Sequence, residues 1–477
     1  MLRPRSWLRW ILNSPAALLL LASIVSPPEL MAQRLPVSAD RAWPVDETER
    51  FLTSSSPVPI WSELNGFATI PSKRGYHDAI YDAPRDRMVV FGGFYGGYKN
   101  DVWALSLTGG SDWIELFPAG IAPGPRAYHT TVYDPIGERM IVFGGSGSSL
   151  RNDVWALSLA GSPEWIPLYP SGTPPSPRGL HSAVFDPVGD RMIVFGGWDN
   201  SYRSDVWELS FAGSPAWNEI TPFGSAPTGR SGHASAYDWV RGRLIVFGGF
   251  DSAYRNDVWA LPLTGEPEWT EITPTGTPPS TRAGSSGIYD PMRDRFVLFG
   301  GWGPYKNDVW AVSLSGQISW TELLPDGTKP IPRYHHSAIY DPLRDRMVVF
   351  GGEGPEDEYI GYFDDTWELA WGSTVDAGNS ESVPGIAMLR RVFPNPSSQD
   401  QTFELALDTE HSALALQVLD TRGRLVWDTG LSHLGPGLHN VRWDGRDHHG
   451  ALVGPSVYFV RVLMEGAPEQ RRVVRIR

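Results

Sequence analysis

Short apolar runs recur along most of the chain, and each run ends at a pair of glycines. In one unit, the run from Met140 to Phe143 follows a turn that contains Asp134 and Pro135. Proline at the second turn position presets φ, and the aspartate before it can bond the turn backbone. The glycine pairs follow one another at steps of 52, 52, 52, 52 and 51 residues: Gly92 and Gly93, Gly144 and Gly145, Gly196 and Gly197, Gly248 and Gly249, Gly300 and Gly301, Gly351 and Gly352.

Two tryptophan positions repeat with the same period. Each unit therefore divides into four short strand-like runs over about 50 residues, which is typical of a propeller blade. Because truncating a buried aromatic ring costs about 3–5 kcal/mol, we expect these tryptophans to pack between blades. The first position is Trp103, Trp155, Trp207, Trp259, Trp310 and Trp367, and the second is Trp113, Trp165, Trp217, Trp269 and Trp320.

The sixth unit lacks a fourth run after Trp367. The segment Pro59 to Leu64, which includes Trp61, matches the fourth run Glu164 to Leu168 and precedes the first unit. We expect it to pair into the last blade and close the ring, which removes an exposed sheet edge.

These features resemble the kelch family, from the double glycine and the spaced tryptophans to the proline-rich lead into Arg-x-x-His. The resemblance covers residues 58–372 and implies an all-β, six-bladed kelch propeller closed by an N-terminal strand. Copper oxidases of this family need a Tyr–Cys crosslink, which a chain without cysteine cannot form. A six-bladed relative is a sialic-acid mutarotase. We find no GxSxG, P-loop or HExxH sequence and predict no catalytic residue.

Composition changes after Trp371. Residues 373–387 are small and polar and are interpreted as a linker, and residues 388–477 alternate in short runs typical of a β-sandwich. The motifs Pro394 to Pro396, Leu419 to Arg424, Trp443 to Asp447 and Gly454 to Phe459 resemble the immunoglobulin-like domain of the flagellar hook-capping protein and type IX secretion sorting domains. The resemblance implies recognition by the secretion machinery. An adhesive or spacer domain is the alternative.

The first 32 residues have the pattern of a secretory signal peptide. Arg3, Arg5 and Arg9 precede an apolar run that is too short to span a bilayer, and Ala32 offers a cleavage position. Residues 33–57 are a lead into the propeller. We therefore predict a secreted protein, extracellular or on the outer cell surface, with no transmembrane span after cleavage. An uncleaved anchor is the alternative.

The net charge of −14 argues against nucleic acid as a partner, because an acidic surface repels phosphate. The absence of cysteine excludes disulfides and thiolate metal sites. We predict no cofactor and no metal site.

Aromatic residues gather in the loops between the second and third runs of each unit. Variable aromatic loops on a rigid scaffold favour recognition, so we predict a non-catalytic binding protein for a protein or glycan ligand. The loop 353–365 is also acidic, with Glu353, Glu356, Asp357 and Glu358, but it lacks the spacing of a calcium loop, and a solvated charge run is favoured. The candidates are Tyr95, Tyr98, Trp198, Tyr202, Phe250, Tyr254, Trp302, Tyr305, Tyr359 and Tyr362.

Cationic residues recur at the start of each innermost run, near the central mouth. Such a ring could hold an anionic sugar, which gives the alternative function, a carbohydrate-active enzyme similar to a mutarotase or epimerase. One aspartate per arginine, Asp101 for the first, instead favours repeated structural ion pairs. The candidates are Arg74, His77, Arg126, His129, Arg178, His181, Arg230, His233, Arg282, Arg333 and His336, with Ser285 in the fifth unit.

Overall fold

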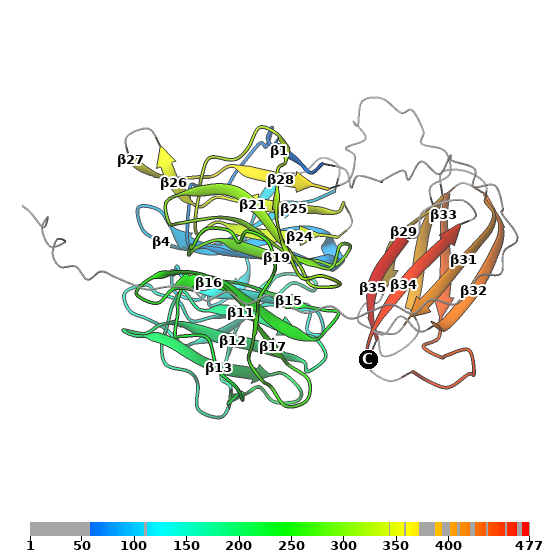
Figure 1. The fold of residues 1–477 in the computed structure, drawn as a ribbon, viewed down its shortest axis with the longest axis horizontal. Helices are drawn as coiled ribbons and strands as arrows, with labels where there is room; N and C mark the ends of the chain where they lie inside the picture. The colour runs from blue at the N-terminus through cyan, green and yellow to red at the C-terminus, as the bar shows by residue number, and fades with distance from the viewer. Residues whose placement is uncertain are drawn as a thin grey trace, which may run out of the picture. The chain divides into compact units, whose positions relative to one another are not determined.

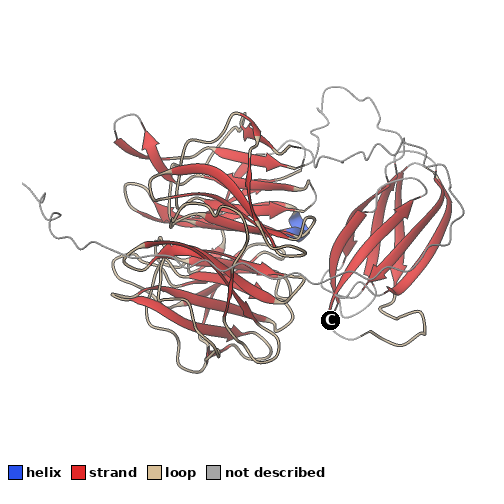
Figure 2. Cartoon of the chain, viewed as in Figure 1, coloured by secondary structure: helices blue, strands red, loops and turns tan. Residues whose placement is uncertain are grey.

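The computed structural model describes residues 58–108, 112–342, 344–356 and 359–371, and in the C-terminal part residues 387–393, 401–407, 411–419, 425–435, 437–453, 456–464 and 470–476. Nearly all of their regular structure is β-strand, and a 3-10 turn at Ala83–Arg85 is the single helical element among them (Figure 2). The predicted signal peptide, the lead and residues 373–386 of the linker lie outside the described residues. Within the described ranges, no helix is long and apolar enough to cross a membrane.

Six sheets form the propeller, as predicted (Figure 1). Each blade has four antiparallel strands, and the two-residue strands β6 (Ala119–Gly120) and β23 (Asp326–Gly327) add to two outer edges. The first three blades are β2 (Asp78–Asp82), β3 (Arg87–Phe94), β4 (Tyr98–Ser106) and β5 (Trp113–Leu116); β7 (Thr130–Asp134), β8 (Arg139–Phe143), β9 (Val154–Ser158) and β10 (Glu164–Leu168); β11 (Ser182–Asp186), β12 (Arg191–Trp198), β13 (Tyr202–Ser210) and β14 (Ala216–Ile220). The next two are β15 (Ala234–Asp238), β16 (Arg243–Phe250), β17 (Tyr254–Pro262) and β18 (Thr270–Ile272); β19 (Ser286–Asp290), β20 (Arg295–Gly301), β21 (Lys306–Ser313) and β22 (Trp320–Leu323).

The sixth blade combines both ends of the propeller sequence. Its strands β24 (Ser337–Asp341), β25 (Arg346–Phe350) and β28 (Thr366–Ala370) are joined by β1 (Ile60–Leu64). Strand β1 pairs antiparallel with β28, and Glu63 lies opposite Trp367 (Figure 1). The predicted closure by the N-terminal segment is confirmed.

The double glycine does not end the second strand in every blade, contrary to the sequence-based expectation. In the first blade β3 continues through Gly92 and Gly93 to Phe94, with a shift of register between Phe91 and Gly93. Both glycines have positive φ, of 64° and 103°, which a side chain would oppose. The pair therefore forms a bulge that turns the strand end, and the Gly93 N–H donates to the carbonyl of Arg126 in the next blade.

The fourth-strand tryptophans pack between blades, as predicted. Trp113 of the first blade lies 4.8 Å from Phe350 of the sixth, and its indole N–H donates to Thr366. The same tryptophan–phenylalanine contact joins all the other neighbouring blades, with ring centroids 4.8–5.5 Å apart: Trp165 with Phe91, Trp217 with Phe143, Trp269 with Phe195, Trp320 with Phe247, and Trp61 with Phe299.

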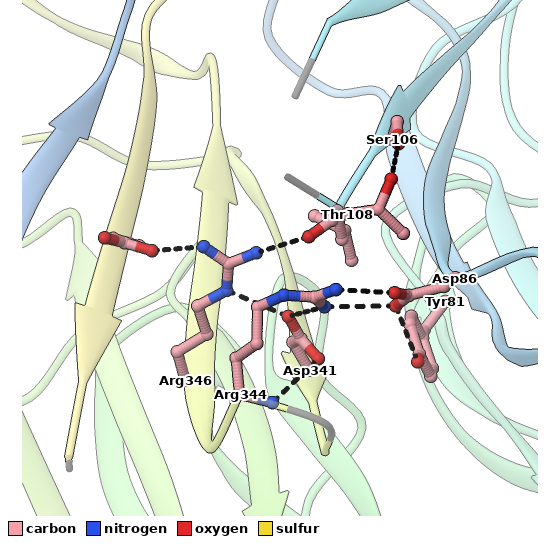
Figure 3. A network of polar contacts seen from close by, with 9 residues as sticks. Tyr81, Asp86, Ser106, Thr108, Asp341, Arg344 and Arg346 are labelled. Carbon is pink, nitrogen blue, oxygen red and sulfur yellow. Dashed lines mark hydrogen bonds and ion pairs between the residues drawn. The ribbon is translucent and has the colours of Figure 1, made fainter. Parts of the chain in front are cut away.

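Ion pairs also join several blades at the turns between their first and second strands. At the closing junction, Arg344 of the sixth blade binds both carboxylate oxygens of Asp86 in the first, at 3.1 and 2.6 Å (Figure 3). Arg344 also binds Asp341, and Asp86 accepts from Tyr81. Equivalent pairs between neighbouring blades are Arg85 with Glu138, Arg241 with Asp294 and Arg293 with Asp345.

The C-terminal part contains two small sheets. One joins β29 (Ala387–Phe393), β30 (Gln401–Leu407) and β33 (Gly437–Trp443), and the other joins β32 (Leu425–Leu434), β31 (His411–Leu419), β34 (Ser456–Met464) and β35 (Gln470–Ile476). Side chains from both sheets share one buried cluster, which includes Phe403, Leu416, Trp443 and Val460. Strand β29 begins at Ala387, one residue before the predicted start of this domain.

We predict that Trp61→Ala lowers the free energy of unfolding by about 3–5 kcal/mol, because it truncates a buried ring that joins β1 to the fifth blade. Urea denaturation followed by circular dichroism measures this loss. Trp239→Ala is the matched control, since Trp239 is 47% exposed and its removal should change stability by less than about 0.5 kcal/mol. Equal effects of the two substitutions would show that β1 does not hold the ring closed.

Candidate functional site

Each blade contains an arginine that is locked to an aspartate on its third strand. In the third blade, Arg178 donates to the two carboxylate oxygens of Asp205 at 2.6 and 2.8 Å, and to the carbonyl of Gly196 at 3.0 Å. The indole of Trp207 donates to the same carboxylate at 2.8 Å. The other pairs are Arg74 with Asp101, Arg126 with Asp153, Arg230 with Asp257, Arg282 with Asp308, and Arg333 with Asp365.

These ion pairs neutralise the six arginines that were predicted to bind an anionic sugar at the central mouth. All six arginines are buried, with at most 1% of each residue exposed. Burial alone would raise the pKa of Asp205, but hydrogen bonds from Arg178 and Trp207 lower it below its ordinary value. A ligand could reach an arginine only by displacing its aspartate. The structural ion pairs predicted from the repeat are present in every blade.

The repeated histidines are buried in the wall of the central cavity, and most of them contact a neighbouring blade. The ring Nε2 of His233 contacts the hydroxyl of Ser182 in the preceding blade at 2.8 Å. Burial lowers the pKa of His129 and of His233 to about 3, so both rings are neutral at pH 7. Equivalent contacts join His77 to Ser337, His181 to Thr130 and His336 to Ser286, whereas Ser285 donates to the carbonyl of Gly300 in its own blade.

One histidine position departs from this pattern. Asp78 stands where four other blades supply a hydroxyl to the next histidine, and it accepts instead from the backbone N–H of Thr131 at 2.6 Å. Nε2 of His129 consequently has no hydrogen-bond partner among the described residues, unlike Nε2 of the other four repeated histidines. Burial raises the pKa of Asp78 to about 6. These two residues line a central cavity of about 260 Å³ bounded by the innermost strands.

A closed circle of backbone hydrogen bonds narrows one mouth of the channel. In each blade the residue before the histidine position has positive φ, between 50° and 68°. Its backbone N–H donates to the backbone carbonyl of the equivalent residue in the preceding blade, at N–O distances of 2.7–3.0 Å. The circle passes once around the axis and includes the junction between the sixth and first blades. Its members are Tyr76, Tyr128, Leu180, Gly232, Gly284 and His335.

The side chains of this circle break the sixfold symmetry. Tyr76 packs between Tyr128 and His335, with ring centroids 4.5 Å from each, whereas the opposite side carries glycine at two positions. Burial lowers the pKa of His335 to about 3. An aromatic surface therefore covers the mouth beside the first, second and sixth blades.

Glu353 anchors this surface. It begins the hairpin of β26 (Glu353–Glu356) and β27 (Tyr359–Tyr362), which projects from the sixth blade (Figure 1). Its two carboxylate oxygens accept hydrogen bonds from Tyr76 and Tyr334, both at 2.6 Å. Only 6% of Glu353 is exposed, so the expectation of a solvated charge run is wrong at this residue. Asp357 and Glu358 lie outside the described residues.

The ten aromatic candidates fall on the same face, at the ends of the second and third strands. Near Glu353, the ring centroids of Tyr95 and Tyr362 lie 5.7 Å apart, and those of Trp302 and Tyr305 lie 4.3 Å apart. A second group joins Tyr202, Phe250 and Tyr254 in the third and fourth blades. Tyr95, Tyr98, Trp198, Tyr202 and Tyr359 are exposed, and Phe250, Tyr254, Trp302, Tyr305 and Tyr362 are half-buried.

The sequence prediction missed Tyr76, Tyr128, Tyr334 and His335. The signal was present in the repeat, since the residue before the histidine position changes from tyrosine to leucine, glycine and histidine among the units. Glu353 similarly occupies a position that carries Phe, Ser or Trp in the other five units. Positions where an internal repeat breaks its own pattern would have identified this site.

Sequence comparisons agree with this architecture. The profile of the KLHDC2/KLHL20/DRC7 kelch-repeats domain matches residues 53–249, and that of the Attractin/LZTR1 β-propeller matches residues 200–365. The two matches overlap and together reach from residue 53 to residue 365, just before β28 of the sixth blade. Residues 58–371 form a six-bladed β-propeller that is similar to kelch-repeat propellers.

Curated relatives share this propeller but are longer proteins. The Drosophila melanogaster leucine-zipper-like transcriptional regulator 1 homolog is 30% identical, over 63% of this chain and 32% of its own length. Human host cell factor 2 is 28% identical, over 58% of this chain and 40% of its own length. The chain thus spans well under half of either relative.

The likeness to a solved structure shows the fold alone. A fungal alcohol oxidase in complex with copper covers 88% of this chain with a TM-score of 0.52 and 14% identity. Across the residues described for our chain, no three His, Asp or Glu side chains are grouped to hold a metal ion.

We predict that mild acid unfolds the propeller. Six of its histidines, including His77, His335 and His336, have a pKa below the ordinary 6.5 when folded. Below pH 6.5 the unfolded chain therefore binds more protons than the folded chain, and stability falls as the pH decreases. Between pH 7 and 5.5 the six histidines together lower the free energy of unfolding by about 7 kcal/mol. Asp78, whose pKa is raised in the folded chain, offsets this loss by less than the contribution of one histidine.

Urea denaturation at pH 7, 6 and 5.5 measures this dependence. His233→Gln removes one titrating ring, so between pH 7 and 5.5 its free energy of unfolding should decrease by about 1.2 kcal/mol less than that of the wild type. His448→Gln, at an exposed histidine, should keep the steep dependence. A stability that stays level from pH 7 to 5.5 would contradict the assignment.

Proposed function

We propose that this protein binds a protein partner through the loop face of its propeller, the face that carries the ten aromatic candidates and the Glu353 cluster. The single observation that carries the proposal is the gathering of tyrosine and tryptophan side chains there, partly exposed, on a scaffold closed by β1. Tyrosine and tryptophan are enriched at protein interfaces, where their rings supply contact area at low entropic cost. The printed names of the two curated relatives above state no reaction.

The same geometry argues against the carbohydrate-active alternative. A site for an anionic sugar at the central mouth needs free cations, but Arg178 is bound to Asp205 and the ring of His181 is neutral and buried. The loop aromatics stay available, whereas the central arginines and histidines hold the blades together. A neutral glycan that stacks on aromatic rings is the remaining alternative ligand.

The proposal includes export of the protein to the cell surface or the medium. It is supported by the signal-peptide pattern of residues 1–32 and by the two small C-terminal sheets with one shared core, which we assign to an immunoglobulin-like sorting domain. We expect the mature protein to begin at Gln33. N-terminal sequencing of protein purified from its native cells tests this, and a chain that retains residues 1–32 would contradict it.

We predict that replacing Trp198, Trp302 and Tyr362 together by alanine abolishes capture of partner proteins. These rings contribute contact area on the loop face, and loss of an interface anchor costs about 2 kcal/mol or more. Proteins retained by the immobilised wild-type chain, identified by mass spectrometry, should be lost from the variant. Circular dichroism should show the same melting temperature for both.

The control carries the same number of alanines on the opposite face. Val188, Trp239 and Met292 are exposed at 43%, 47% and 49% in the turns between first and second strands. Their triple alanine variant should retain every captured protein. Retention by the loop variant would refute the proposal, and binding to a glycan array without protein capture would favour the glycan alternative.

A further inference from the structure

Glu353 is a buried carboxylate without a cationic partner. Both of its oxygens accept from tyrosine hydroxyls, and across the described residues no arginine or lysine forms an ion pair with it. The nearest repeated arginines, Arg74 and Arg333, are each bound to the aspartate of their own blade. A buried charge is costly unless it is paired, so this mouth of the channel holds uncompensated negative charge.

Tyrosines surround this carboxylate from several blades. The hydroxyls of Tyr76 and Tyr334 donate to it and lie 3.2 Å from each other. Burial is the main cause that raises the pKa of Tyr305 and of Tyr362, and the negative charge of Glu353 is the second cause. These phenols therefore stay neutral and add no charge that would oppose Glu353. With Tyr128 they form what we call the tyrosine–Glu353 cluster.

The rings of the cluster present several aromatic faces. Tyr76 lies 4.5 Å from Tyr128, and Tyr362 lies 5.7 Å from the exposed Tyr95. Tyr362 also covers the backbone of Gly75, where a Cβ would lie 3.2 Å from the ring. Aromatic faces carry partial negative charge and attract cations within about 6 Å of the ring centre. The cluster and its buried carboxylate therefore attract a cation and repel an anion.

We propose that the tyrosine–Glu353 cluster binds an arginine side chain of the partner protein. The proposal rests on the function proposed above and names the chemistry that the partner presents. A guanidinium is planar and weakly hydrated, so it stacks on aromatic rings while it faces a carboxylate. The net charge of −14 also favours association with a basic partner.

The test compares two isosteric probes on the full chain. N-acetyl-arginine amide carries the guanidinium, and N-acetyl-citrulline amide replaces it by a neutral urea. Titration followed by nuclear magnetic resonance should show that the wild type binds the arginine probe about tenfold more tightly, the effect of one charge-assisted contact. Glu353→Gln, which keeps the shape of the acceptor, should abolish this preference.

Two further variants separate charge from folding. Glu115→Gln removes one exposed carboxylate on the outer strand β5 and should keep the tenfold preference. Tyr76→Phe keeps the ring and removes one hydrogen bond to Glu353, so it should still prefer arginine and show that the mouth tolerates substitution. Equal binding of the two probes by the wild type, or a preference retained in Glu353→Gln, would overturn the proposal. Tighter binding of choline than of the arginine probe would also overturn it, in favour of a small quaternary ammonium ligand.

Failure of this inference is distinguishable from failure of the proposed function. If captured proteins depend on the loop aromatics but are retained by Glu353→Gln, the propeller binds proteins and only the arginine assignment is wrong. If the loop-face triple variant itself retains its partners, the proposed function is wrong.

Discussion

Closure of the ring is the constraint on which the rest of this structure depends. The sixth blade is complete only when β1, from the start of the propeller, pairs with β28. The junction of the sixth and first blades is then held by Trp113 against Phe350, by Arg344 with Asp86, and by one link of the backbone circle. Tyr76 and Glu353 lie 277 residues apart and meet across this same junction. The site therefore exists only in the closed ring.

The repeat divides the polar residues into two kinds. Those that recur in every blade, such as Arg178 and Asp205, bind one another and fix the third strand to the start of the first. A bidentate pair that satisfies both partners suits a buried position, and it leaves nothing for a ligand. Polar residues that occur in a single blade do not belong to these repeated pairs. Glu353 is such a residue, and its negative charge is not neutralised by an ion pair.

Sequence reasoning succeeded where one residue type served one repeated purpose. The blade number, the closure by Trp61, the tryptophan packing and the arginine–aspartate pairs all follow from periodicity. It failed where the outcome depends on three-dimensional proximity. The acidic loop suggested solvent-exposed charge, yet Glu353 is buried because tyrosines from the first and sixth blades reach it.

Electrostatics link the scaffold to the surface that it presents. The scaffold keeps its histidines neutral by burial, and their low pKa costs little stability at pH 7 but leaves the fold sensitive to acid. Its arginines are neutralised by aspartates, so neither kind of cation contributes to the field at the mouth. Glu353 adds a negative charge at this mouth, shielded from water by phenol rings. A desolvated carboxylate gains more from an incoming cation than an exposed one does, because little water remains to be displaced. The same burial that makes Glu353 costly in the free protein thus favours a cationic partner.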